Sequence, residues 1–165
     1  MDAYEAVTEA ISEHEYIVHH RDEKGYDHLE EEGSTIEVLN ENKGDEMFVE
    51  FNQGEATIFF GNNHDHFSLS FDDEIYWLVD LIDDIFNNRM CAVTLYGYRE
   101  NANPKLLGTG FVKDKDLKNS SLDKIFEYVY EIEEYKMMLE HNGGKAIINY
   151  WDPSLNKEIE LGKKQ

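Results

Sequence analysis

The 165-residue chain carries 36 acidic and 15 basic side chains, so its formal net charge is −21 at neutral pH. Such a polyanion is repelled by nucleic acid phosphates and anionic membranes and is attracted to basic proteins, although the same charge could serve solubility alone. Apolar residues make up 41% of the chain and aromatic residues 13%, which is too rich for a disordered acidic tail. We therefore expect one folded acidic domain over residues 1–165, with no nucleic acid or membrane as a direct partner.

The only cysteine, Cys91, lies in an apolar run at 90–93 and has no second cysteine for an internal disulfide. Its surroundings are typical of a buried small hydrophobic residue, and a lone cysteine fits a reducing compartment. Residues 1–5 lack the positive region of a secretion signal, and no apolar stretch approaches the ~20 residues that span a bilayer. The sequence predicts a cytoplasmic location.

The first segment, residues 2–13, is predicted to be an amphipathic helix with Ala3, Val7, Ala10 and Ile11 at helical spacing. A short strand at 16–18 and an acidic loop at 21–33 are expected next.

From residue 34 the apolar spacing changes to two, and turn residues separate four β-rich runs. Their apolar residues are Ile36 and Val38; Phe48 and Phe51; Ile58 and Phe60; and Phe67, Leu69 and Phe71. This pattern predicts an antiparallel meander of about four strands.

The clearest predicted helix covers residues 72–87 and begins at a cap formed by Ser70 or Asp72. One continuous apolar stripe contains Ile75, Leu78, Val79, Ile82, Ile85 and Phe86. The opposite side contains Asp73, Tyr76, Trp77, Asp80, Asp83, Asp84 and Asn87, which mix carboxylates with two large aromatic rings.

A hairpin with strands at 90–98 and 106–112 should follow. A second helix is predicted from residue 120 to about 134, with Asp123 near its cap and Leu122, Ile125, Phe126 and Val129 buried. Residues 131–139 could prolong this helix or begin a strand; we favour a strand that turns at 142–144 into 146–151, with a frayed tail at 162–165. The predicted fold class is α+β, with a mostly antiparallel sheet packed against two or three helices.

Two histidines, His64 and His66, point to the same side of an extended segment and could hold zinc. A closed zinc site needs further ligands at matched spacing, so we favour a role in the turn and strand edge, and the pair His19 and His20 has the same deficit. Adjacent acidic residues at 72–74 and 83–84 could do acid–base work, but such pairs are expected by abundance alone in so acidic a chain. The chain also has no phosphate loop, serine elbow or cysteine nucleophile motif. The sequence therefore predicts no enzyme, metal or cofactor.

The acidic face of the 72–87 helix is the better candidate, since exposed aromatic rings supply contact area and carboxylates pair with Arg or Lys of a partner. The predicted partner-binding residues are Asp73, Tyr76, Trp77, Asp80, Asp83 and Asp84. The alternative is that Tyr76 and Trp77 are covered by the N-terminal helix or by the sheet.

The layout of residues 35–112 carries a family resemblance: the run GEATIFFG at 54–61 precedes HDHF at 64–67, an Asp-rich helix and a strand. This arrangement resembles small bacterial immunity proteins of polymorphic or contact-delivered toxin systems. The resemblance implies a cognate toxin, often a basic nuclease, that is bound tightly and blocked sterically or electrostatically.

The leading hypothesis is thus a non-catalytic acidic protein that neutralises a basic toxin by occluding its active site. A nucleic acid mimic that displaces DNA or RNA from basic proteins is the first alternative. A metal-dependent hydrolase using His64, His66 and nearby Asp residues is the second.

Overall fold

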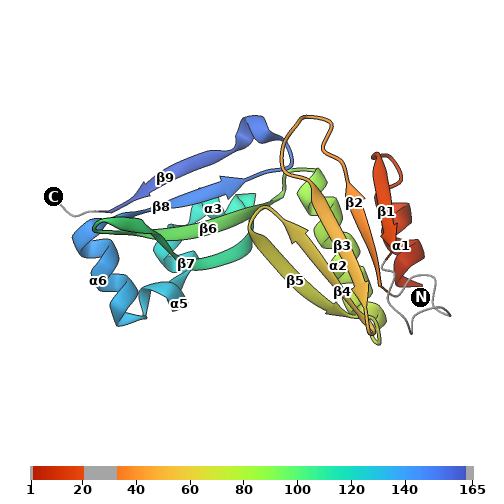
Figure 1. The fold of residues 1–165 in the computed structure, drawn as a ribbon, viewed down its shortest axis with the longest axis horizontal. Coiled ribbons are helices and arrows are strands. Elements are labelled where there is room, and N and C mark those ends of the chain that lie inside the picture. Colours follow the sequence, from red (N-terminus) through yellow and green to blue (C-terminus); the bar gives the residue numbers. More distant parts are fainter. Residues whose placement is uncertain (1, 21–32, 163–165) are drawn as a thin grey trace.

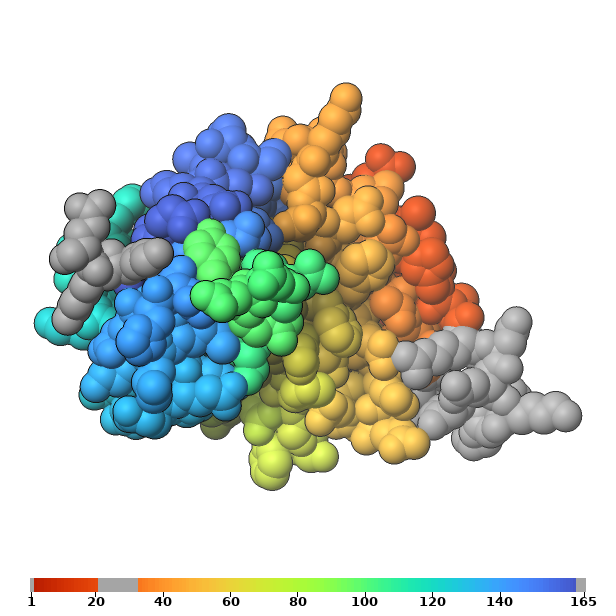
Figure 2. Space-filling view, turned by 60° about the vertical axis from the view of Figure 1, so that its left-hand side comes forward, coloured from red at the N-terminus to blue at the C-terminus, as the bar shows by residue number. Residues whose placement is uncertain are grey.

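The computed structural model describes residues 2–20 and 33–162, which form two antiparallel sheets and six α-helices. The predicted α+β class is confirmed. The sheets lie side by side (Figure 1), and in the space-filling view the red-to-yellow first half and the blue last part occupy opposite sides of the molecule (Figure 2). Most of the predicted acidic loop at 21–33 and of the predicted frayed tail at 162–165 lies outside the described residues.

The first sheet is a meander whose five strands pair in chain order. The strands are β1 (Tyr16–His20), β2 (Ser34–Val38), β3 (Met47–Asn52), β4 (Glu55–Phe60) and β5 (Asn63–Ser68). A two-residue turn joins β3 to β4, and both of its residues, Gln53 and Gly54, have positive φ. A turn with two positive φ angles matches the right-handed twist of the strands in a hairpin. Strands β2 to β5 confirm the four strands expected in this region.

Two helices, α1 (Ala3–Ala10) and α2 (Asp72–Phe86), pack on one face of this sheet and lie behind its strands in Figure 1. The Asp2 side chain caps α1 by accepting a hydrogen bond of 2.9 Å from the Glu5 amide. The α2 stripe is confirmed at Ile75, Leu78, Ile82 and Ile85, which are buried together with Leu81, while Val79 and Phe86 are only partly buried.

The junction between β5 and α2 differs from the prediction. The strand ends at Ser68, and Phe71, expected to face the core, is 62% exposed at the N-cap position. Neither Ser70 nor Asp72 makes the predicted cap, since α2 has no side-chain capping bond; Glu74 instead accepts a hydrogen bond from the Ser68 amide. Acidic residues in the first turn still favour this start, because they face the positive end of the helix dipole.

The second sheet has the strand order β7-β6-β8-β9 and is also antiparallel. Its strands are β6 (Met90–Arg99), β7 (Ala102–Lys113), β8 (Gly144–Asn149) and β9 (Lys157–Leu161), with a 3-10 turn η1 (Pro153–Leu155) before β9. The β6–β7 hairpin confirms the prediction. The remaining helices, which contribute to the core of this sheet, are α3 (Asp114–Asn119), α4 (Leu122–Ile125), α5 (Glu127–Tyr130) and α6 (Glu133–Asn142).

Residues 122–130 are largely helical, as predicted, but the expected continuous helix over 120–134 and the favoured hairpin after it are wrong. The helix is interrupted at Phe126, whose ψ of 38° leaves the helical range, and residues 133–142 form α6 rather than a strand. Tyr135, Met138 and Leu139 recur at helical spacing and pack against the second core. Gly143, with φ of 74°, ends α6, so the glycine pair that suggested a hairpin turn acts as a helix terminator.

Trp151 joins the two halves. It follows β8 in the second sheet, yet it is 5% exposed within the core of the first, with its ring centroid 4.8 Å from that of Phe86. Its carbonyl accepts a hydrogen bond of 2.8 Å from the Asn40 side chain, and the buried Asn63 side chain donates to the Val93 carbonyl at 3.1 Å. The sheets therefore share both apolar and polar contacts.

A partly buried polar network supports the second sheet. The Tyr150 hydroxyl donates to Asp114 at 2.7 Å, and Lys118 pairs with the same carboxylate at 2.6 Å. Lys118 and, second, Tyr150 lower the pKa of Asp114, while burial and the Asp114 carboxylate raise the pKa of Tyr150. No helix within residues 2–20 and 33–162 is long and apolar enough to cross a membrane.

We expect Asp114→Asn to lower the free energy of unfolding at pH 7 by about 1.5–3 kcal/mol, the usual contribution of a hydrogen bond to a charged group. Because the folded-state pKa of Asp114 is lowered, this contribution is present above the unfolded-state pKa of about 4 and is lost as the pH falls through the folded value. Urea denaturation at pH 7 and at about pH 2 measures the difference, with the exposed Asp116→Asn as the control for the change in net charge. Equal effects of the two variants would contradict this prediction.

Candidate protein-binding surface on helix α2

The solvent-facing side of α2 brings together the residues predicted from the sequence. Asp73, Tyr76, Trp77 and Asp80 are neighbours at spacings of three and four, so they form one compact group, here called the α2 patch. The opposite side of the helix is fixed in the first core by its buried residues. The patch thus stands on a rigid element.

Both aromatic side chains of the α2 patch are exposed, Tyr76 at 54% and Trp77 at 61%. The alternative that α1 or the sheet covers them is therefore wrong. An exposed tryptophan beside an exposed tyrosine is an apolar area of the kind that forms the centre of protein interfaces. Phe71, exposed just before the helix, adds a third ring at the same end of α2.

The carboxylates of α2 fall into two groups. Within the described part of the chain, Asp73 and Asp80 have no hydrogen-bond or ion-pair partner for their side chains. Asp83 and Asp84 both pair with Arg89, whose Nε lies 2.7 Å from Asp84, and these contacts raise the pKa of Arg89. Asp73 and Asp80 are therefore the carboxylates of this helix that are open to a cationic partner.

The two histidines considered for zinc lie on the far side of the first sheet from α2. His64 and His66 share one face of β5, as predicted, with ring centroids 5.1 Å apart. His66 Nδ1 is 2.8 Å from Glu55 and 3.1 Å from the Thr57 hydroxyl. No group of three or more His, Cys, Asp or Glu side chains in residues 2–20 and 33–162 is arranged to hold a metal ion.

Cys91 is buried, as predicted, and its thiol donates a hydrogen bond of 3.3 Å to the Val112 carbonyl. Burial raises the pKa of the thiol to about 11, so the thiolate form is scarce near neutral pH. This environment is typical of a structural cysteine.

Comparison with known proteins adds no assignment to this geometry: no protein-family model, curated protein or solved structure matches the chain. The likeness to immunity proteins stays a prediction from the layout of residues 35–112. Function must therefore be argued from the surface itself.

For Cys91 we expect no reaction with Ellman's reagent at pH 8 in the folded protein and one reacting thiol per chain after denaturation. Absorbance of the released thiolate measures this reaction. Rapid modification of the folded protein would show that the thiol is accessible and would contradict its structural role.

For Trp77→Ala we expect a change in the free energy of unfolding of no more than about 0.5 kcal/mol, because the side chain is largely exposed. The control is Trp151→Ala, which empties a core position and should cost about 3–5 kcal/mol. Urea denaturation followed by circular dichroism compares them. A large loss from Trp77→Ala would mean that its ring supports the fold and is unsuited to a free interface.

Proposed function

We propose that this protein is a non-catalytic inhibitor that binds a basic protein toxin through the α2 patch and occludes the toxin's active site. The observation that supports this function best is the α2 patch itself: two exposed aromatic rings between two carboxylates that have no partner in the described part of the chain. In this sense the protein acts as an immunity protein.

Each component of the α2 patch has a physical role in such binding. Trp77 and Tyr76 bury large apolar areas in a partner's pocket and lose little side-chain freedom when they do so. Asp73 and Asp80 pair with Arg or Lys around that pocket, and the net charge of −21 speeds the encounter with a basic surface. Since the buried side of α2 already fixes the helix, little ordering is needed on binding.

The aromatic rings also favour a protein inhibitor over a nucleic acid mimic. Mimicry requires spaced negative charges, and its binding to unrelated basic proteins should weaken steeply with salt. A partner pocket for Trp77 gives a contact that salt does not screen, and it lets the inhibitor discriminate among toxins.

The test is affinity capture from a lysate of the protein's own organism, using the immobilised chain and washes of rising salt, with mass spectrometry of what remains. We expect one basic protein to survive high salt on the wild type, and Trp77→Ala to raise its Kd about 30-fold or more, as for an interface hot spot. Asp73→Asn with Asp80→Asn should mainly slow association at low salt.

The matched control is Tyr128→Ala, because Tyr128 lies outside the α2 patch and is as exposed as Tyr76, at 54%. It should leave binding unchanged, whereas Tyr76→Ala should weaken it. Loss of all captured proteins together as salt rises would favour mimicry or nonspecific polyanion binding. A single retained partner that binds Trp77→Ala as tightly as the wild type would exclude the α2 patch.

A further inference from the structure

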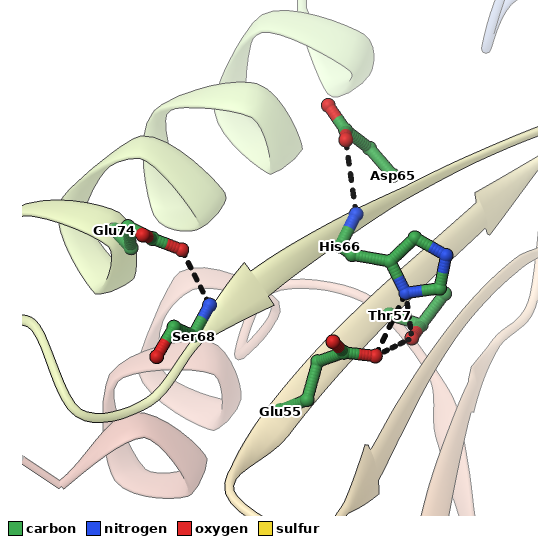
Figure 3. A network of polar contacts seen from close by, with 6 residues as sticks. All are labelled: Glu55, Thr57, Asp65, His66, Ser68 and Glu74. Carbon is green, nitrogen blue, oxygen red and sulfur yellow. Dashed lines mark hydrogen bonds and ion pairs between the residues drawn. The ribbon is translucent and has the colours of Figure 1, made fainter.

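The first sheet has a second face, which we call the outer face, opposite the helices. Because cross-strand partners point to the same side, the pairing registers define this face. One row contains Ile17, Glu37, Phe48, Phe59 and His64, and the next contains His19, Thr35, Glu50, Thr57 and His66. Figure 3 shows the His66 ring lying over β4 on the side away from α2.

The outer face carries more apolar surface than a solvated sheet face requires. Antiparallel sheets with one face in water usually alternate apolar residues inward with polar residues outward. Here Ile17 is 45% and Phe59 37% exposed, and Phe48 between them is only partly buried. These side chains form a stripe across the sheet.

The strands of the outer face carry glutamates, and their only basic side chains are histidines, with His19 paired to Glu37 and His66 to Glu55. None of the residues in β1 to β5 is Lys or Arg, whereas Glu37, Glu50 and Glu55 all lie on this face. Glu46, just before β3, shares a hydrogen bond with Glu37, and this contact raises the pKa of Glu46. Two carboxyl groups held together favour a cationic neighbour, and His19, whose Nε2 lies 2.6 Å from Glu37, takes that position.

A hollow of about 390 Å³ lies at the β3–β5 side of the outer face. It is lined by Glu50, Asn52, Gln53, Glu55, Thr57, Phe59, His64 and His66. One oxygen of Glu55, Oε1, lies 2.8 Å from His66 and 3.5 Å from the Thr57 hydroxyl, and the other oxygen points away from both (Figure 3). The Phe59 ring lies next to His64, with centroids 5.8 Å apart. A carboxylate and an aromatic ring thus line the same space.

We propose that the outer face docks an arginine-bearing segment of a basic protein, with the guanidinium group in the hollow between the Glu55 carboxylate and the Phe59 ring. A guanidinium group is planar, stacks on aromatic rings and donates paired hydrogen bonds to a carboxylate, while a lysine ammonium offers only a compact charge. The apolar stripe of Ile17, Phe48 and Phe59 receives the aliphatic parts of the same segment.

A second copy of this chain is a poor occupant, because two bodies that each carry a charge of −21 repel one another. The outer face and the α2 patch lie on opposite sides of one sheet. The arginine site therefore does not depend on the proposed function of the α2 patch.

The experiment is an NMR titration of the ¹⁵N-labelled full chain with N-acetyl-arginine amide and, separately, N-acetyl-lysine amide. We expect saturable shifts of the Glu55, Phe59 and His66 amides, with arginine binding several-fold tighter than lysine. Glu55→Gln and Phe59→Ala should each weaken arginine binding at these amides about fivefold or more.

Matched controls distinguish specific arginine binding in the hollow from nonspecific attraction of cations to the acidic chain. Glu158→Gln removes another exposed strand glutamate that pairs with a basic side chain, Lys145, and Phe71→Ala removes another exposed phenylalanine. Neither variant should change the amide shifts of the outer face on arginine binding. Trp77→Ala should not change them either, so loss of partner binding at the α2 patch can be distinguished from loss of arginine binding at the outer face. Shifts that grow linearly, that are equal for arginine and lysine, or that persist in Phe59→Ala and Glu55→Gln would overturn the proposal.

Discussion

The burial of Trp151, which directly follows β8 of the second sheet, in the core of the first sheet is the constraint that organises this molecule. The ring packs against Phe86 of α2, and the Trp151 carbonyl is held by Asn40 from the first half of the chain. The core of the first sheet is therefore completed by a residue from the second half. Because α2 is fixed by this core, the orientation of the α2 patch depends on a contact made from outside the first sheet.

A chain with this much negative charge repels itself when it folds. The structure limits this free-energy cost because it keeps the charged side chains at the surface and out of the apolar cores. The apolar cores contain no buried carboxylate among the described residues, and the ion pairs that do form, such as Asp84 with Arg89, lie at the surface. The unpaired negative charge remains in solvent, where salt screens it over about 8 Å. The two faces of one sheet thus remain available for different kinds of contact, an aromatic helix on one side and an open strand surface on the other.

Local spacing predicted the elements whose apolar pattern is regular. The alternation through Ile36, Val38 and Ile58 was enough to predict the meander, and the period of α2 placed Asp73, Tyr76, Trp77 and Asp80 on one side of a helix. Whether another element covers that side is set by packing between distant segments, so the exposure of Trp77 required the structure.

The errors have the same cause. The apolar pattern places Phe48 and Phe51 in one run, but an odd separation sends them to opposite faces of β3. Only the position of the helices decides which face is buried. The acidic run at 72–74 could have signalled that the strand must end before Phe71. The contact between Asn40 and Trp151 spans 111 residues and has no local signature.

The late position of Trp151 also has a consequence for biosynthesis. A ribosome delivers the chain from its amino end, so all five strands and both helices of the first sheet emerge while their core still lacks this ring. Until residue 151 emerges, the nascent first half exposes the apolar surface that the ring will cover. The α2 patch and the outer face thus lie on a completed core only after residue 151 has been made.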